Sequence, residues 1–370
     1  LLLKLKIFMK ICLFGKNLTN LILSQILIKK GISVHMYYQK KKKLSKINYN
    51  RTIGLSFENI KFLKKYDIDV EKIGQKISKI FLYKNDSKET FLKFDNKNSL
   101  FFIVKNHLLF DRVYKKLKKR KEFKESNINK DSDYLKLLKK KNFQFFVNSE
   151  TNNFINKKFF FQNIKKDYKS TSYITVIDHQ KLKNNTSVQI FTRRGPLAFL
   201  PISNSKTSLV YSVTDKLDIN ENEFKELVKR YNKFYKIKKF YNVDKFKLSF
   251  FLSKKYTYKN ILSFGDTLHK VHPLAGQGFN MTVRDIKSLT DQIQKNIDLG
   301  LELSTAILSF EKERKHNNFF FAYGIDFLHN FFEKENRFKI LDNKKISQTL
   351  DNSFFLKKIS EKFANKGFNF

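Results

Sequence analysis

The chain has 370 residues, of which 41% are hydrophobic and 15% aromatic, so it can bury a sizeable core and is not disordered in composition. Lysine and arginine number 75 against 34 aspartates and glutamates, and the formal net charge of +41 taken alone suggests a polyanionic partner. Because Asn, Ile, Phe and Tyr are also plentiful while Gly, Pro and Ala are scarce, we attribute most of this charge to AT-rich codon usage.

The sequence disfavours three classes of protein: nucleic-acid-binding proteins, disulfide-stabilised proteins and proteins with a membrane-spanning helix. We predict no specific nucleic-acid partner, because no stacking platform or recognition helix is evident beside the charge. The single cysteine, Cys12, excludes an internal disulfide. No stretch reaches the roughly 18 uninterrupted apolar residues of a membrane-spanning helix.

The first forty residues predict a strand, a helix and a second strand. Residues 10–15 are an apolar run that ends in glycine, residues 17–31 have the composition of a helix, and residues 32–38 are another apolar run. Elements in this order predict a parallel sheet with a crossover helix.

The next hundred residues alternate between predicted helices and strands. Leu55, Ile60, Leu63 and Ile68 have helical spacing, which predicts a helix within residues 51–68. Further along the chain we expect a hairpin at 76–95 that turns at 85–87, a helix from about His107, a loose connection at 125–142 and a buried strand at 143–147.

From about residue 170 to 255 the pattern becomes β-rich and predicts an antiparallel sheet set into the chain as a second domain. The predicted strands are at 172–178, 187–193, 197–203 and 208–213, with a helix at 220–235. After residue 280 the chain is predicted to be mostly helical, with a loop at 343–353.

Glycine and proline number only 11 and 3 in the whole chain, yet they gather in "GDTLHKVHPLAGQG", residues 265–278. An apolar strand at 260–264 leads into Gly265 and Asp266, and Gly276-Gln277-Gly278 opens a helix. The start of a helix offers free N–H groups and a positive dipole end, and glycines let a ligand touch the backbone. An aspartate at a strand end can accept hydrogen bonds from hydroxyl groups. Together these features predict a cradle for a polyol chain and for a ring with negative charge at one edge.

This arrangement resembles the second FAD-binding motif of the aromatic-ring flavoprotein monooxygenases, most closely the ubiquinone-biosynthesis hydroxylases. The resemblance rests on Gly265-Asp266, His269, Pro273, Gly276-Gln277-Gly278, Asn280 and Asp285, and it continues in "RTIGLS" (51–56), "GPLAFLPI" (195–202), "SLVYSV" (208–213) and "SFEKERK" (309–315). It implies that Asp266 binds the ribityl chain and that the isoalloxazine ring is lined by Pro273, Gly276, Gln277, Gly278 and Asn280. It also makes Gly15, Arg51 and Gly265 candidate cofactor-binding residues.

The resemblance implies an α/β fold: a glutathione-reductase-like FAD-binding Rossmann domain with an inserted antiparallel-sheet substrate domain and a helical C-terminus. The predicted FAD-binding domain is discontinuous and comprises residues 9–75, 96–160 and 256–295. The predicted substrate domain comprises residues 76–95 and 161–255, and the C-terminal helical region comprises residues 296–370.

The sequence departs from the family at the nucleotide end of the site. The family has G-x-G-x-x-G after its first strand and an acidic residue at the end of its second. Here the first motif reads Gly15-Lys16-Asn17-Leu18-Thr19-Asn20, and the acidic position falls at Tyr38. A mid-chain Asp-Gly motif appears as Asn148-Ser149, and a helix-start arginine aligns with His107. The flavin-ring half of the site is therefore retained, while the adenosine and pyrophosphate half is altered.

Family membership implies that NADH or NADPH reduces FAD and that oxygen from O2 is transferred to the aromatic ring of a polyprenylated ubiquinone precursor. His272 and Pro273 are the catalytic candidates, and no metal site is predicted. Two roles stay open for His269: it relays a proton, or it orients the loop through a hydrogen bond. The alternative function is a degenerate, non-catalytic member that acts as a scaffold or partner among other quinone-biosynthesis proteins.

The last residues, 352–370, place Phe355, Ile359 and Phe363 on one face of a basic amphipathic helix. Two interpretations stay open: the helix lies on an anionic membrane, or it packs its phenylalanines on the core. The expected location is the cytoplasm, peripheral to the inner face of a membrane.

Overall fold

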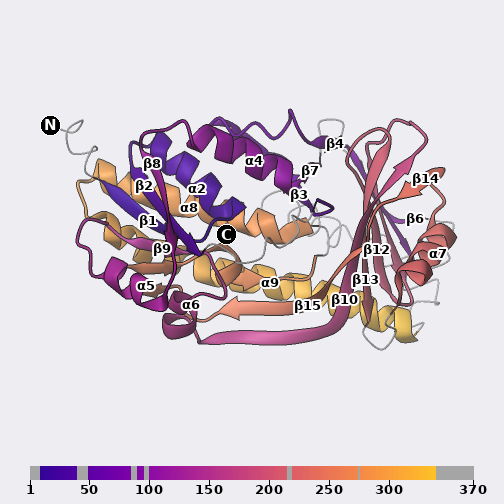
Figure 1. The fold of residues 1–370 in the computed structure, drawn as a ribbon. Coiled ribbons are helices and arrows are strands. Elements are labelled where there is room, and N and C mark those ends of the chain that lie inside the picture. The colour runs from indigo at the N-terminus through magenta and orange to yellow at the C-terminus, as the bar shows by residue number, and fades with distance from the viewer. Residues whose placement is uncertain are drawn as a thin grey trace.

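The computed structural model describes residues 9–39, 49–84, 90–95, 100–214, 219–273 and 276–338. Figure 1 shows two main bodies: helices around a sheet at the left, and a tall antiparallel sheet with one helix on its outer side at the right. Strands β10 (Asn163–His179) and β15 (Asp244–Ser253) and helix α9 (Ala306–Phe338) run from one body towards the other.

The left-hand body is built on a six-stranded sheet in the order β16-β17-β9-β1-β2-β8, parallel throughout except for its edge strand β16. Its strands are β1 (Lys10–Phe14), β2 (Ser33–Gln39), β8 (Phe123–Ile128), β9 (Phe146–Asn148), β16 (Thr257–Tyr258) and β17 (Ile261–Ser263). The predicted strand, helix and strand at the N-terminus are confirmed, because β1 pairs in parallel with β2.

Both faces of this sheet are covered, as the apolar runs predict. Ile11 and Leu13 of β1 belong to one buried cluster, and Cys12 and Phe14 belong to another on the opposite face. The first face is covered by α2 (Leu18–Lys29), α4 (Asn106–Leu117) and α8 (Gln277–Asp298). The second face is covered by α5 (Asp131–Leu138) and α6 (Phe154–Phe159).

The right-hand body is a nine-stranded sheet in the order β18-β15-β10-β13-β12-β11-β5-β6, with β14 paired to β10. Its further strands are β5 (Lys79–Lys84), β6 (Thr90–Asp95), β11 (Thr186–Thr192), β12 (Gly195–Pro201), β13 (Lys206–Thr214), β14 (Ile237–Phe240) and β18 (His269–Lys270). Every pair is antiparallel except β11 with β5. The predicted inserted antiparallel sheet is therefore confirmed, and the domain boundaries themselves remain a proposal.

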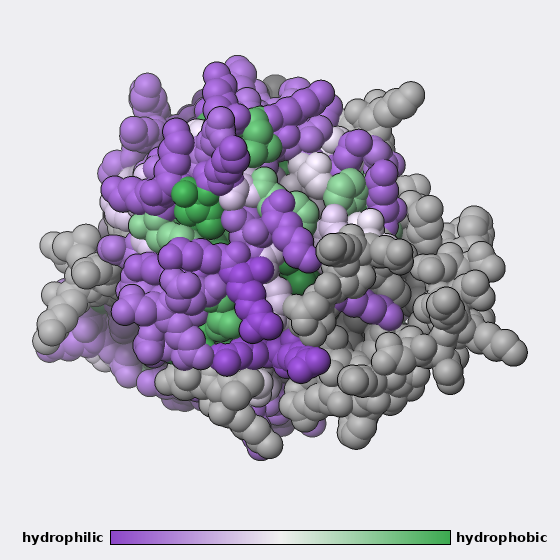
Figure 2. Space-filling view, turned by 90° about the vertical axis from the view of Figure 1, so that its right-hand side faces the viewer, coloured by the Kyte–Doolittle hydropathy of each residue, from purple (hydrophilic) through white to green (hydrophobic). Residues whose placement is uncertain are grey.

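Helix α7 (Glu221–Tyr231) covers the outer side of this sheet, packing Phe224 and Val228 against Tyr173 and Leu197. The part of this face that is described is mainly hydrophilic, with hydrophobic residues only in small separated groups (Figure 2). This agrees with a charge that is spread over solvated surface.

A small antiparallel sheet in the order β3-β7-β4 lies between the two bodies (Figure 1). Its strands are β3 (Thr52–Ser56), β4 (Gln75–Ile77) and β7 (Phe101–Lys105), and α3 (Phe57–Lys64) follows β3 directly. The prediction of helix across residues 51–68 was therefore wrong in its first third. Leu55 pairs with Phe102 across the strands, so its burial follows strand pairing and only coincides with helical spacing.

The loose connection predicted at 125–142 was also wrong, because this segment holds the end of β8 and the whole of α5. β8 is an edge strand that buries Phe123 and Ile128, while α5 buries Tyr134 and Leu137. So few buried positions leave only a weak hydrophobic pattern.

Some predicted features fall on residues that the structure does not describe: the turn at 85–87, the loop at 343–353 and the helix at 352–370. Within the ranges that are described, no helix is both long enough and apolar enough to cross a membrane.

The turn into β12 depends on a glycine. Gly195 has a φ of 134°, and a Cβ built there would lie 2.0 Å from the backbone oxygen of Ser212. We expect Gly195→Ala to lower the free energy of unfolding by about 2–5 kcal/mol, because backbone strain and a backbone clash add. Gly300→Ala is the matched control, since Gly300 also has positive φ, 68°, but nothing lies within 4 Å of its Cβ position. Urea denaturation of both variants tests this, and equal losses would contradict it.

Candidate functional site

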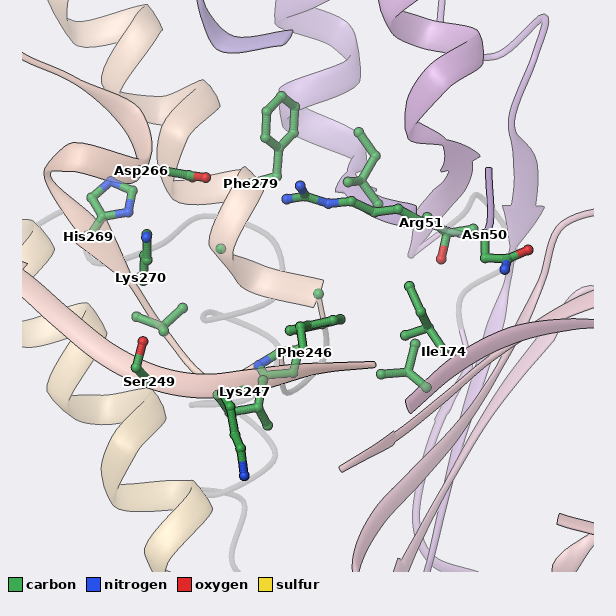
Figure 3. Close-up of a pocket in the computed structure, with 18 residues that line it drawn as sticks. Asn50, Arg51, Ile174, Phe246, Lys247, Ser249, Asp266, His269, Lys270 and Phe279 are labelled. Atoms are coloured by element: carbon green, nitrogen blue, oxygen red, sulfur yellow. The ribbon is translucent and has the colours of Figure 1, made fainter. Parts of the chain in front are cut away.

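A cavity of about 480 Å³ lies where the first turn of α8 faces strands of the nine-stranded sheet (Figure 3). It is lined by Asn50, Arg51, Thr52, Ile53, Ile174, Val210, Phe246, Lys247, Leu248, Ser249, Asp266, His269, Lys270, Val271, Pro273, Gly276, Gly278 and Phe279. The predicted site residues on this list are Arg51, Asp266, Pro273, Gly276 and Gly278. The predicted site residues that do not line it are Gly15, Gly265, His272, Gln277 and Asn280.

One wall of the cavity is the glycine-rich start of α8. Gly276 precedes the helix in a left-handed conformation, with φ 65° and ψ 24°. A Cβ at this position would lie 3.5 Å from the backbone nitrogen of Gly54 in β3, which is an ordinary contact, so the positive φ is what favours glycine here. The first N–H groups of α8 have no partner within the helix, and the positive end of its dipole lies here. This wall suits a flat ligand with negative charge at one edge.

Asn280 fixes this helix start against β3 and does not line the cavity. Its Oδ1 accepts hydrogen bonds from the backbone N–H of Ser56, at 2.9 Å, and from Nδ2 of Asn59, at 2.8 Å. Its Nδ2 donates to the backbone oxygen of Gly54 at 3.0 Å. Asn280 therefore positions the helix start, and its predicted cofactor contact stays a prediction.

A second wall comes from the turn after β17. Gly265 and Asp266 form a short 3-10 turn, η2 (Gly265–Thr267), in which Asp266 is exposed and lines the cavity (Figure 3). The hydroxyl of Thr267 accepts the Phe264 N–H at 2.8 Å, which holds the turn closed. Gly265 has a φ of 66°, and a Cβ there would lie 3.0 Å from the side chain of Thr19 in α2. Gly265 therefore lets two segments meet, and it is not among the residues that line the cavity.

The remaining wall of the cavity is apolar, and the sequence did not predict its residues. Ile174 of β10, Val210 of β13 and Leu248 of β15 supply an apolar surface, and the ring of Phe246 is 44% exposed beside them. These residues lie far apart in the sequence, and strand alternation alone does not reveal which strands meet at a cavity. Arg51, a predicted cofactor-binding residue, also lines the cavity, and its side chain extends towards the start of α8 (Figure 3).

A buried charge network centred on Asp285 of α8 is connected to the cavity through His269. His269 Nε2 lies 2.7 Å from Asp285 Oδ2, while Arg314 Nε donates to Asp285 Oδ1 at 2.8 Å. Asn318 Nδ2 also donates to Asp285 Oδ1, at 3.0 Å. Burial raises the pKa of Asp285, but the charge of Arg314 and the hydrogen bond with His269 outweigh it, so the net pKa is lowered. The carboxylate thus stays ionised and ties β18, α8 and α9 together.

His269 and His272 have different surroundings. His269 lines the cavity, and Asp285 holds its Nε2. His272 is 1% exposed, and its ring packs 4.0 Å from that of His329 and 5.3 Å from that of Tyr168, measured between centroids. Burial, with the nearby His329, lowers the pKa of His272 well below its ordinary value, so the ring is neutral. Among the described residues, neither ring nitrogen of His272 has a hydrogen-bond partner.

Two further predicted residues do not line the cavity. Gln277 is buried as the first residue of α8. Gly15 lies at the end of β1 with a φ of 103°, and a Cβ there would lie 3.1 Å from that of Glu150. In the described part of the chain, no group of three or more His, Cys, Asp or Glu side chains is placed to hold a metal ion.

The cavity fits the ring and ribityl half of FAD. Its volume falls within the roughly 300–1,000 Å³ of small-molecule sites. Gly276 and Gly278 leave one wall without side chains, and Asp266 presents a carboxylate beside it. An isoalloxazine needs such a flat, electropositive wall, and a ribityl chain needs a hydroxyl acceptor next to it.

Comparisons with known proteins agree with this geometry. Residues 159–316 match the family model described as FAD binding domain. The chain is 27% identical over 194 residues to the ubiquinone biosynthesis monooxygenase COQ6 of Dictyostelium discoideum, covering 41% of this chain and 39% of that protein. It is 26% identical over 153 residues to the ubiquinone hydroxylase UbiL of Rhodospirillum rubrum, covering 40% and 36%. The matches thus span less than half the length of these relatives.

Solved structures share the fold over nearly the whole chain. PqsL of Pseudomonas aeruginosa, a probable FAD-dependent monooxygenase, matches with a TM-score of 0.70 and 14% identity, over 90% of this chain and 98% of that one. The flavin-dependent brominase Bmp2 matches with a TM-score of 0.71 and 11% identity, over 97% and 94%. The predicted α/β fold class and the predicted resemblance to FAD-dependent monooxygenases are confirmed, and the family match supports FAD as the cofactor.

The Asp285 network gives a stability prediction. Asp285→Asn keeps the shape of the side chain but leaves the buried Arg314 without its counter-charge, so we expect a loss of about 3–5 kcal/mol in the free energy of unfolding. Adding Arg314→Met should recover part of this loss. Glu58→Gln is the control, because the Glu58–Lys61 pair is more than half exposed and should contribute under about 1 kcal/mol. Chemical denaturation distinguishes the cases, and a loss at Asp285 no larger than at Glu58 would refute the network.

Proposed function

We propose that this chain is an FAD-dependent monooxygenase that hydroxylates the aromatic ring of a polyprenylated ubiquinone precursor, with NADH or NADPH as reductant. The observation that carries the proposal is a cavity with two unlike walls. The start of α8 and the turn at Asp266 form a polar wall, in which Gly276 and Gly278 expose the backbone. Strands β10, β13 and β15 supply a second wall, which is apolar. A flavin ring suits the first wall, and an aromatic substrate suits the second.

On the polar wall, each residue would hold a different part of the cofactor. The backbone at Gly276 and Gly278 would contact the ring, and the dipole of α8 would stabilise negative charge at its nearest edge. Asp266 would accept hydrogen bonds from ribityl hydroxyls. Arg51 would add a positive charge on the opposite side of the cavity.

The chemistry that a bound flavin supplies is hydride uptake from NADH or NADPH and transfer of one oxygen atom of O2 to an electron-rich ring. The chain's own contribution is to orient both rings and to exclude water from between them. Ile174, Val210 and Leu248 would pack on the substrate ring. His269, held at Nε2 by Asp285, leaves Nδ1 as the ring nitrogen available for a proton relay.

A polyprenyl tail would leave the cavity past Phe246, whose ring is 44% exposed. Lys247 and Lys270 are also exposed among the residues that line the cavity. Apolar and cationic groups side by side favour an anionic lipid surface. We therefore also propose a cytoplasmic protein that meets its substrate in peripheral contact with a membrane.

The second candidate function is a non-catalytic partner of other quinone-biosynthesis proteins. One observation favours it: the position of the ribose-binding acidic residue is Tyr38, and Lys16 lies over its ring at 4.9 Å. This candidate predicts a protein that binds no flavin.

The proposed function is tested by comparing FAD binding by the wild-type protein with FAD binding by Asp266→Ala. We expect the purified protein to show the visible flavin absorbance after FAD is added, and Asp266→Ala to weaken binding roughly tenfold to a hundredfold through the loss of charge-assisted hydrogen bonds. Asp298→Ala, which removes an exposed aspartate at the other end of α8, should bind as the wild type does. Flavin-loaded protein should then oxidise NADH or NADPH faster when phenols with prenyl chains are added.

A wild-type protein that stays colourless in excess FAD would refute the monooxygenase and leave the non-catalytic partner. Equal FAD affinity in wild type and Asp266→Ala would instead refute the assignment of Asp266.

A further inference from the structure

The turn between β1 and α2 is occupied by a lysine with protein partners of its own. Lys16 Nζ donates to the hydroxyl of Tyr114 at 2.8 Å and lies 3.3 Å from Glu125 Oε2. The same ammonium group is 4.0 Å from the ring centroid of Tyr114 and 4.9 Å from that of Tyr38. The side chains of Lys16 and Glu125 are only 22% and 17% exposed. Lys16 therefore joins α4, β2 and β8 across the end of the sheet.

In a dinucleotide-binding strand–helix–strand unit, this is where the nucleotide lies. The pyrophosphate rests on the glycine turn at the helix start, and the ribose is held by an acidic residue at the end of the second strand. In this chain Lys16 and Asn17 form the turn and Tyr38 is at the strand end. None of the three is among the residues that line the cavity.

Asn17 closes the same turn from the other side. Its Nδ2 donates to Ser149 Oγ at 2.8 Å and to the backbone oxygen of Ser149 at 3.1 Å. Its Oδ1 accepts the backbone N–H of Asn20 at 3.1 Å, so one of the free N–H groups at the start of α2 already has a partner. A glycine at position 17 could make none of these side-chain contacts. The turn is thus bonded to the loop after β9.

Displacing Lys16 would be costly for a polyphosphate ligand in particular. If Lys16 moved, Glu125 would keep Tyr114 and Lys118 as its partners among the described residues, at 2.8 Å and 3.1 Å, with its carboxylate near the incoming phosphates. Two negative groups in a partly buried place repel each other. FAD would have to meet this cost, whereas the ring and ribityl chain alone would not.

We propose that Lys16 and Asn17 fill the nucleotide half of the site, so that this chain recognises a flavin by its ring and ribityl chain and gains no affinity from the adenylate half of FAD. The site then accepts FMN as well as it accepts FAD. This inference rests on the proposed flavin binding and deepens it, because it names the part of the cofactor that is recognised.

The first test is a comparison of dissociation constants for FMN and FAD, measured by quenching of flavin fluorescence with the full chain. We expect the two constants to agree within about threefold. Tighter binding of FAD by about a hundredfold or more would overturn the inference while leaving the proposed function intact. Binding of neither flavin would instead refute the proposed function.

Lys16→Ala sharpens the test, because two roles for this lysine predict opposite results. If Lys16 blocks the nucleotide half, its removal should tighten FAD binding by about tenfold and leave FMN binding unchanged. If Lys16 instead holds the pyrophosphate, its removal should weaken FAD binding, and the inference fails. An unchanged ratio of the two constants would also overturn the assignment of Lys16.

Two further variants guard the interpretation. Asn17→Gly should likewise favour FAD over FMN, and it keeps a residue that is tolerated at a helix start. Lys29→Ala, at the other end of α2, removes a lysine paired with Asp67 on the surface and should change neither constant. If the Lys16 variant fails to fold, the wild-type ratio and the Asn17 variant still decide the outcome.

Discussion

The cavity depends on where the first turn of α8 lies. Asn280 joins that turn to β3 through hydrogen bonds to the backbone of Gly54 and Ser56, and the positive φ of Gly276 favours glycine where the helix begins. One turn further along the same helix, Asp285 binds β18 and α9 through His269 and Arg314. The helix start is therefore held from both sides before any ligand arrives.

The two halves of the candidate site differ in what fills them. On one side, Asp266 and the glycines leave room and polar groups for a ring and a hydroxylated chain. On the other side, Lys16 and Asn17 make hydrogen bonds of their own in the place where a dinucleotide would extend. The departures in the first motif thus have a structural counterpart: Lys16 bonds to Tyr114 and Glu125, and Asn17 bonds to Ser149. The site is consistent with a flavin held mainly by one end.

The sequence predicted those features that depend on local pattern. Gly265, Asp266 and the glycines at the start of α8 stand out because glycine is so rare elsewhere, and the segments of the inserted sheet are rich in β-forming residues. It failed where burial depends on distant partners. Leu55 has helical spacing with Ile60 but pairs with Phe102 in a strand, and the edge strand β8 buries too few residues to be recognised.

The candidate site was predicted only in part, because several of its residues also depend on partners that are distant in the sequence. His272 lies in the right loop, but its ring packs against His329 of α9, which no local pattern could reveal. The apolar wall of Ile174, Val210 and Leu248 required knowledge of which strands meet the helix. The partners of Lys16 lie about a hundred residues away, in α4 and β8, so its role could be seen only in the folded chain.

Hydrogen exchange with and without FAD tests the central claim most directly, because it reports separately on each half of the site. The account predicts slower exchange on FAD addition at residues 49–56 and 265–281, and no change at residues 15–20 and 37–39. Strong new protection at residues 15–20, or none at residues 265–281, would contradict it.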